Sequence, residues 1–209
     1  MNKVAAKRMS GGEHRTPERL SRTDWIMAAR DALISGGVHA VKVDLISNRL
    51  KITRGSFYWH FKSRAELLGA LLELWESQNT KPFEEVAQRT DVDAVQKFAD
   101  MVRIWLDEND FDPAFDAAVR DWARSSPSVT KRIMSIDAFR MSQLEKVFQD
   151  MGYEGTEAMV RARVTYYHQI GYYALDVHES KARRRELLPY YLEILMGSRG
   201  DLQKALQLL

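Results

Sequence analysis

The chain has 209 residues, of which 45% are hydrophobic and 29% charged, the composition of a folded globular protein with one mid-sized core or two smaller units. It contains no cysteine, which excludes disulfide bonds, a thiol nucleophile and cysteine-based zinc sites. The net charge of +2 is uneven: residues 1–64 hold 13 Lys and Arg against 5 Asp and Glu, whereas the remainder is acidic. This asymmetry favours a module that binds a polyanion, attached to a different unit.

Membrane segments and export signals are not expected. The longest apolar run, "LLGALLEL" at 67–74, is interrupted by Glu73 and falls short of the roughly 18 residues that a membrane-spanning helix needs. The first twenty residues are polar and basic, and they do not resemble a secretory signal. We therefore expect a cytoplasmic protein that makes no contact with a membrane.

The first elements in chain order are a basic arm and a helix. Residues 1–19 are rich in Lys and Arg and poor in large apolar side chains, which predicts a disordered arm. Apolar residues then recur at helical spacing until Gly36-Gly37, which predicts a helix over 22–35. Ser21 and Asp24 form a capping-box pattern at its start.

Two short helices follow. The first begins near Asp44 and is about two turns long, and the second covers 54–60 with Thr53 as its N-cap. The connecting segment "LKIT" is only four residues long. This spacing predicts a helix-turn-helix.

Longer helices make up the rest of the chain. Ser63 and Glu66 form a capping box for a helix over 64–80, which ends near Pro82. Strand patterns are nearly absent, so the predicted fold class is all-α. The further helices are expected at 92–109, 113–125, 128–150, 156–178 and 183–196.

The stretch "RGSFYWHFK" places five aromatic side chains in a row. Phe57 and Phe61 are four apart and share one helical face, which predicts that they are core residues. Arg54 is the only long bidentate donor of the stretch and is the best candidate to read a guanine. The outward-facing side chains can donate hydrogen bonds to phosphate, and they are Tyr58, Trp59 and His60. We expect this helix to enter the major groove of DNA.

At these residues the sequence resembles a known family. The segment "VKVDLISNRLKITRGSFYWHFKSRAELL", 41–68, is similar to the DNA-binding region of the tetracycline-repressor (TetR) family, and "AARDALISGGVHAV" resembles its first helix. The resemblance implies a homodimer with an N-terminal three-helix helix-turn-helix DNA-binding domain at 20–80, with its motif at about 42–61. A C-terminal helical ligand-binding and dimerisation domain would occupy 83–209. The implied function is a transcriptional repressor that a small molecule releases from double-stranded operator DNA.

The resemblance also assigns DNA contacts to individual positions. Lys62 and Arg64 match phosphate contacts of the family at the start of the fourth helix. The family usually has Gly in the turn where this chain has Lys51, and a left-handed Lys would cost about 1 kcal/mol there. The other contacts implied by the family are Val43, Thr53, Arg54, Gly55, Ser56, Tyr58, Trp59 and His60.

Two other classes of function compete with this one. Ser56 and His60 have the spacing of a nucleophile and a base, but no carboxylate is placed to orient the histidine, and an exposed helix offers no oxyanion hole. The five histidines are scattered, so we expect no metal, no cofactor and no enzymatic activity. The other alternative is a TetR-like nucleoid or cell-division adaptor, which binds DNA and a protein partner without an inducer. A large exposed apolar patch would favour it.

Large apolar residues at helical spacing fill the C-terminal half, and most of them are predicted to be core. They are Phe98, Met101, Trp105, Phe115, Val119, Trp122, Met134, Tyr166, His168 and Tyr172. A ligand pocket would use the members that place a hydrogen-bonding group in an apolar wall. We select Trp105, Trp122, His168 and Tyr172, and we expect a largely hydrophobic effector.

The dimer interface is expected on the last two long helices, which in the TetR family pair with their symmetry mates as a four-helix bundle. Small and polar residues from Ala158 to Tyr173 share one strip of the first of these helices. The alternative is that both helices only cover their own core. The predicted interface residues are Ala162, Gln169, Tyr173, Leu187, Tyr191 and Ile194.

Overall fold

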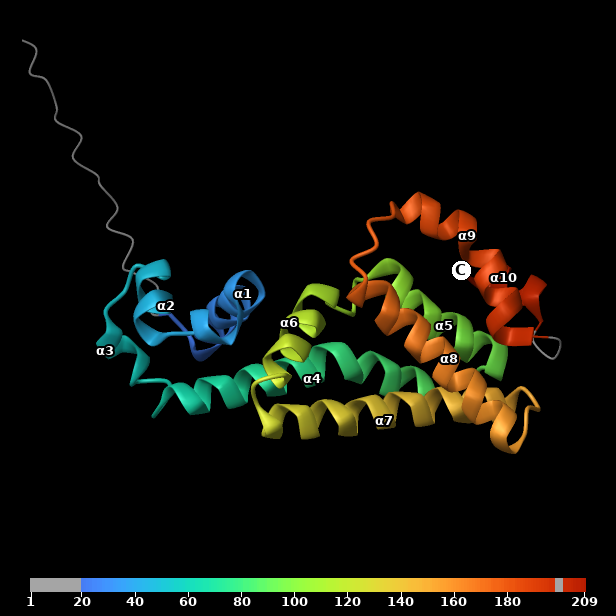
Figure 1. Ribbon diagram of the computed structural model, residues 1–209, viewed down its shortest axis with the longest axis horizontal. Coiled ribbons are helices and arrows are strands. Elements are labelled where there is room, and N and C mark those ends of the chain that lie inside the picture. Colours follow the sequence, from blue (N-terminus) through green and yellow to red (C-terminus); the bar gives the residue numbers. More distant parts are fainter. Residues whose placement is uncertain (1–19, 198–200) are drawn as a thin grey trace, which may run out of the picture.

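The computed structural model describes residues 20–197 and 201–209, and within them every regular element is a helix (Figure 1). The all-α prediction is therefore confirmed. The predicted basic arm, residues 1–19, lies outside the described residues.

The N-terminal helices follow the sequence pattern closely. Helix α1 (Arg22–Ala40) begins with the predicted capping box of Ser21 and Asp24, and it is interrupted at Gly36 and Gly37, where Gly37 has φ 68°. The turn after α2 contains Lys51 in the left-handed conformation, at φ 57°. The two helices that this turn joins are α2 (Val43–Arg49) and α3 (Arg54–Phe57). Helix α3 is shorter than the predicted helix over 54–60, because residues 58–60 form a turn.

The connecting helix α4 (Arg64–Gln88) is longer than predicted, because it does not end near Pro82. A proline removes one backbone hydrogen bond but does not end a helix that tertiary packing holds on both sides. Trp75 and Asn79 are buried before the proline and Phe83 is buried after it. Burial on both sides therefore carries the helix through Pro82.

The remaining helices include one that the sequence pattern did not predict. This helix, α10, is two turns long and packs against α5 and α9 near the C-terminus. The C-terminal helices are α5 (Ala94–Asp107), α6 (Pro113–Ala123), α7 (Pro127–Asp150), α8 (Gly155–Ala174), α9 (Lys181–Met196) and α10 (Leu202–Leu208).

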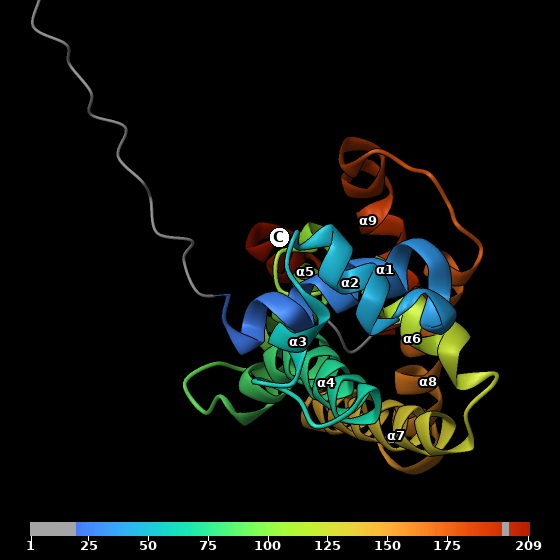
Figure 2. The same cartoon turned by 90° about the vertical axis from the view of Figure 1, so that its left-hand side faces the viewer.

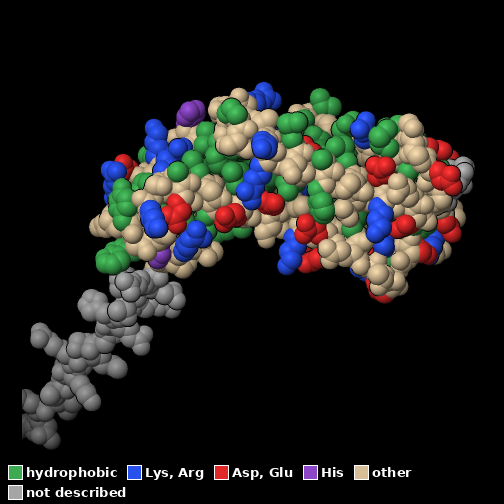
Figure 3. Space-filling model, turned by 90° about the horizontal axis from the view of Figure 1, so that it is seen from below, with side chains coloured by type: hydrophobic (Ala, Val, Ile, Leu, Met, Phe, Trp, Pro, Cys, Tyr) green, Lys and Arg blue, Asp and Glu red, His purple; other side chains and the backbone are tan. Residues whose placement is uncertain are grey.

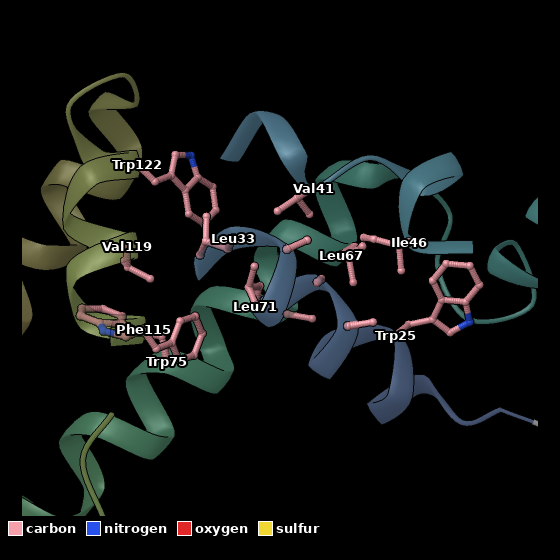
Figure 4. Packing of buried hydrophobic residues seen from close by; sticks show 14 of the residues in the cluster. Trp25, Leu33, Val41, Ile46, Leu67, Leu71, Trp75, Phe115, Val119 and Trp122 are labelled. Atoms are coloured by element: carbon pink, nitrogen blue, oxygen red, sulfur yellow. The ribbon is translucent and has the colours of Figure 1, made fainter. Parts of the chain in front are cut away.

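Two apolar cores lie one after the other along α4. The first core contains α1 to α3 and is completed by α6 and the start of α7. In it Trp122 of α6 packs beside Leu33 of α1 (Figure 4). The second core lies among α5, α7, α8, α9 and α10. Because α4 contributes to both, with Leu71 in the first and Phe83 in the second, it joins the two ends of the molecule.

A buried carboxylate links three helices between these cores. Asp116 of α6 accepts a hydrogen bond from the indole nitrogen of Trp75 on α4 (3.0 Å) and another from Arg120 (2.7 Å). Arg140 of α7 is 2% exposed and lies 3.5 Å from the same carboxylate. A buried charge is tolerated only when it is paired in this way.

Candidate nucleic-acid interface and ligand pocket

Two buried phenylalanines anchor α3 and the turn after it, and both are core residues, as predicted. Phe57 is fully buried and its ring lies 5.4 Å from that of Phe61 and 5.2 Å from that of Trp25 on α1. Each large side chain buried in this way contributes about 1.5–3 kcal/mol. The remaining faces of the helix are consequently presented in one fixed orientation at the end of the molecule (Figure 2).

The exposed face of this segment consists of large aromatic side chains. Trp59 is 79% exposed and Tyr58 is 56% exposed, although one turn of the same chain buries Phe57. Several Lys and Arg side chains lie at this end of the protein on the face that Figure 3 shows. Of the residues that the family resemblance implies as DNA contacts, Val43, Ser56 and His60 are half-buried, and the exposed ones are Thr53, Arg54, Gly55, Tyr58, Trp59, Lys62 and Arg64.

Arg54 is held toward this surface by its neighbours. Its guanidinium lies 3.4 Å from the carboxylate of Asp44 on α2. Interaction with the Tyr58 hydroxyl, and then the charge of Asp44, raise the pKa of Arg54. The side chain therefore carries its charge and points across the helix-turn-helix.

Two residues near the interface behave differently from the sequence expectation. Thr53 precedes α3 with extended backbone angles, but its side chain makes no capping hydrogen bond within the described chain, so the hydroxyl stays available. The Arg64 guanidinium donates to the backbone carbonyls of Val41 (2.6 Å) and Val38 (2.7 Å). Arg64 thus ties the start of α4 to the end of α1, a structural role that the motif did not reveal.

The capping pattern before α4 is also altered in one detail. The Ser63 hydroxyl accepts from the backbone N–H of Glu66 (3.2 Å), as a capping box requires. The Glu66 carboxylate, however, accepts from the N–H of Lys62 (2.7 Å). The carboxylate therefore fixes the backbone one residue earlier, next to the exposed Lys62 side chain.

A small cavity of about 60 Å³ lies between α5, α8 and α9. Three of the four predicted ligand contacts, Trp105, His168 and Tyr172, line it. The fourth, Trp122, does not line this cavity, because it faces the first core and α1. Met134 was wrongly placed in the inner surface, since it is exposed on α7.

The polar groups of this pocket include one that was expected elsewhere. Gln169 lines the cavity and is 8% exposed, and its amide nitrogen has no hydrogen-bond partner among the described residues. Arg184 of α9 is paired with Glu108 (2.6 Å) and with the carbonyl of Trp105 (2.8 Å). Burial lowers the pKa of His168, so its imidazole is neutral at neutral pH.

The strip predicted as a dimer interface mostly faces the protein's own core. Ala162 and Gln169 are buried within the chain, which corrects their assignment, and Tyr173 is half-buried with its ring stacked on Phe111. Leu187 is half-buried, whereas Tyr191 and Ile194 of α9 are exposed. Helix α8 instead exposes a different strip, formed by Val160, Val164 and Tyr167.

These exposed side chains form a continuous surface, which we call the α8–α9 patch: Val160, Val164, Tyr167 and Ile194. Val160, Val164 and Ile194 line one shallow groove between the two helices. The small residues Ala158 and Ala162 lie on the opposite side of α8 and allow its close approach to the rest of the chain. Both strips have helical spacing, and only the packing distinguishes them.

The described residues contain neither a membrane-spanning helix nor a cluster of metal ligands. No helix there combines the length and the apolar composition that crossing a membrane requires. In the same ranges, no three His, Asp or Glu side chains gather in an arrangement suited to a metal ion.

Comparisons with known proteins agree with this architecture. The sequence model of bacterial regulatory proteins of the tetR family matches residues 26–71. A transcriptional regulator from Rhodococcus sp. Rha1 superposes with a TM-score of 0.60 at 21% identity, over 90% of this chain and 97% of that chain. A Clostridium perfringens protein described as a fatty acid metabolism regulator gives 0.63 at 14% identity, over 84% and 98%.

The complex of BioQ with double-stranded operator DNA superposes less well. Its TM-score is 0.48 at 20% identity, over 90% of this chain and 99% of that chain. Curated proteins give no significant sequence match. The two better superpositions show that the whole helical fold, beyond the matched segment, is shared with solved structures of regulators.

Proposed function

This chain belongs to the tetR family of bacterial regulatory proteins, and we propose that it is a homodimeric repressor that a small, largely hydrophobic ligand releases from its operator. The observation that carries the proposal is the surface of α3. Trp59 and Tyr58 are exposed beside a charged Arg54, on a segment that Phe57 anchors rigidly. A fixed, basic and aromatic surface of this kind suits DNA rather than solvent.

Sequence recognition would begin with α3 in the major groove. Arg54 is the residue suited to a bidentate contact with guanine. The hydroxyls of Thr53 and Tyr58, the indole of Trp59 and the ammonium of Lys62 would bind phosphates. Arg54 is therefore the proposed source of base specificity, and the other four residues position the helix.

Dimerisation would use the α8–α9 patch. Contiguous apolar side chains on two neighbouring helices are typical of a surface that another protein covers. A second copy of this chain would bring the same patch to the contact, as two-fold symmetry requires. The two copies of α3 would then enter successive major grooves, about 34 Å apart or somewhat more.

Release would couple the pocket to the DNA-binding end through α8 and α6. On α8, three residues before Gln169, Tyr166 donates a hydrogen bond to Asp137 of α7 (2.7 Å). Arg120 of α6 binds the same Asp137 carboxylate (2.7 and 2.9 Å). Helix α6 in turn packs against Leu33 of α1. A ligand that binds more tightly when α8 takes another position would shift this chain of contacts. The distance between the two copies of α3 in the dimer would then change.

The division of roles on α3 can be tested with two substitutions. Arg54→Ala should relax the sequence preference at one base pair of the selected operator, because it removes a base contact. Tyr58→Phe removes only a hydroxyl that binds phosphate, so it should weaken binding to all sequences alike. Binding of both variants to a panel of single-base operator variants measures this, and identical profiles would contradict the assignment.

The adaptor alternative would use the α8–α9 patch for a different protein. Light scattering of the purified chain separates the two cases, because a repressor with this patch should be a dimer at micromolar concentration. Val164→Asp should convert it to a monomer, whereas Val177→Asp, at another exposed apolar position, should not. A wild-type monomer would contradict the dimer proposal and favour the adaptor.

A further inference from the structure

The amide nitrogen of Gln169 is a buried donor without a hydrogen-bond partner among the described residues. Its side chain is more than nine-tenths buried, lines the cavity between α5, α8 and α9, and leaves its nitrogen unpaired among the described residues. An unpaired buried amide is costly, and such groups in folded proteins usually have a partner. A bound molecule that hydrogen-bonds to the amide would supply one.

The other walls of the cavity limit the chemistry of that molecule. Most of the wall is apolar. Its aliphatic members are Val102 and Leu106 from α5 and Leu188, Leu192 and Leu195 from α9, and its aromatic members are Trp105, Tyr172 and Tyr191. Such a surface gains most from burying hydrocarbon. The molecule should therefore be mainly hydrocarbon.

The charged groups at the edge of the cavity disfavour an ionised ligand. Arg184 is already neutralised by Glu108, and Glu179 adds a further negative charge near the Tyr172 hydroxyl (3.4 Å). Among the described lining residues, no unpaired cation is left for a carboxylate, and the neutral His168 supplies none. An ammonium group would find Glu179 at the edge, but the groups inside that can accept a hydrogen bond from it, such as those of Gln169 and His168, are uncharged.

The size of the cavity implies that α9 moves. About 60 Å³ is far below the roughly 300 Å³ of a small-molecule site. The N-terminal end of α9 is held to the end of α5 by polar contacts: Lys181 donates to the carbonyl of Asp107, and Arg185 pairs with its carboxylate (both 2.6 Å). The helix also contains Pro189. These contacts can be exchanged for water, so α9 can move outward at its N-terminal end.

We propose that the cavity under α9 binds an uncharged, mainly hydrocarbon compound with a single carbonyl oxygen, such as a ketone, ester or lactone, which accepts a hydrogen bond from Gln169. The identity of the binding site does not depend on the regulatory function. Only the claim that this compound is the inducer rests on the proposed function.

Three probes with the same chain length and different head groups test the ligand class: 2-nonanone, nonanoate and nonylammonium. Titration calorimetry on the full-length protein should show that 2-nonanone binds at least about tenfold more tightly than either ion. In Gln169→Leu, the loss of one hydrogen bond should weaken 2-nonanone about five- to tenfold. Gln149→Leu, a matched change at an exposed glutamine of α7, should leave the affinity unchanged.

Gln169→Leu should fold at least as stably as the wild type, since it replaces an unpaired amide by an aliphatic group. Leu195→Trp is a second variant, which should fill the cavity and abolish binding while leaving Gln169 in place. The proposal is overturned if 2-nonanone fails to bind at about 1 mM, if an ion binds more tightly, or if Gln169→Leu and the wild type bind it equally. Binding of 2-nonanone without release of operator DNA would support the site and contradict the proposed repressor mechanism.

Discussion

Two aromatic residues at the end of α3, Phe57 in the helix and Trp59 in the turn after it, should respond in opposite ways to substitution. Phe57 is fully buried, so Phe57→Ala should cost about 3–5 kcal/mol of folding free energy. For a chain of this size, that loss lowers the melting temperature by roughly 6–20 °C. Trp59 is 79% exposed, so only about 50 Å² of its side chain is buried, and Trp59→Ala should cost about 1 kcal/mol or less.

The effect on DNA binding should be the reverse for Trp59. A hydrogen bond to a charged phosphate contributes about 1.5–3 kcal/mol, so its loss should raise the Kd roughly ten- to hundredfold. Circular dichroism melting measures stability, and fluorescence anisotropy with an operator fragment selected from random DNA measures binding. The reasoning is refuted if Trp59→Ala melts as early as Phe57→Ala, or if it binds the operator like the wild type.

Other positions give further predictions. Lys51→Gly relieves the left-handed turn and should stabilise by up to about 1 kcal/mol in urea unfolding relative to Lys51→Ala; a Gly variant less stable than the Ala variant would contradict this. Arg64→Ala loses two hydrogen bonds to carbonyls and should cost about 1–3 kcal/mol, while Lys62→Ala should cost almost nothing; equal losses would exclude the structural role. Arg140→Met should cost about 3–5 kcal/mol, because a buried ion cluster loses a partner, and a melting curve like that of the wild type would refute it. Burial lowers the pKa of His168, so below about pH 6.5 the unfolded state binds a proton more readily than the folded state does. Between pH 7.5 and 5.5 the wild type should therefore lose more folding free energy than His168→Gln. Equal losses in the two proteins would argue against this.

The sequence alone was sufficient to predict several local features of the DNA-binding end. The capping box of Ser21 and Asp24 and the burial of Phe57 and Phe61 each depend on a few neighbouring residues. Such features can be read from spacing alone, because the competing arrangements would bury a polar group or expose an aromatic face. The role of Arg64 could not be read, because its carbonyl partners lie more than twenty residues earlier in the chain.

In the C-terminal half it was harder to predict which face of each helix is buried, because both sides of the helices have apolar residues. On α8 the strip with Ala162 and Gln169 and the strip with Val164 have the same helical spacing, and only tertiary packing decides which one is buried. Pro82 was taken as a helix end although buried residues on both sides hold the helix together. In each case the deciding interaction is between elements far apart in sequence.

Sequence-specific DNA binding is the central claim, and competition binding tests it most directly. Labelled DNA tiling the region upstream of the gene and its neighbours would be titrated with the full-length protein at about 150 mM salt, with unlabelled competitor. The account predicts one fragment that binds at least about a thousandfold more tightly than the competitor. Uniform weak binding that vanishes as salt rises would contradict it, and would show that the helix-turn-helix only anchors the protein to DNA by charge.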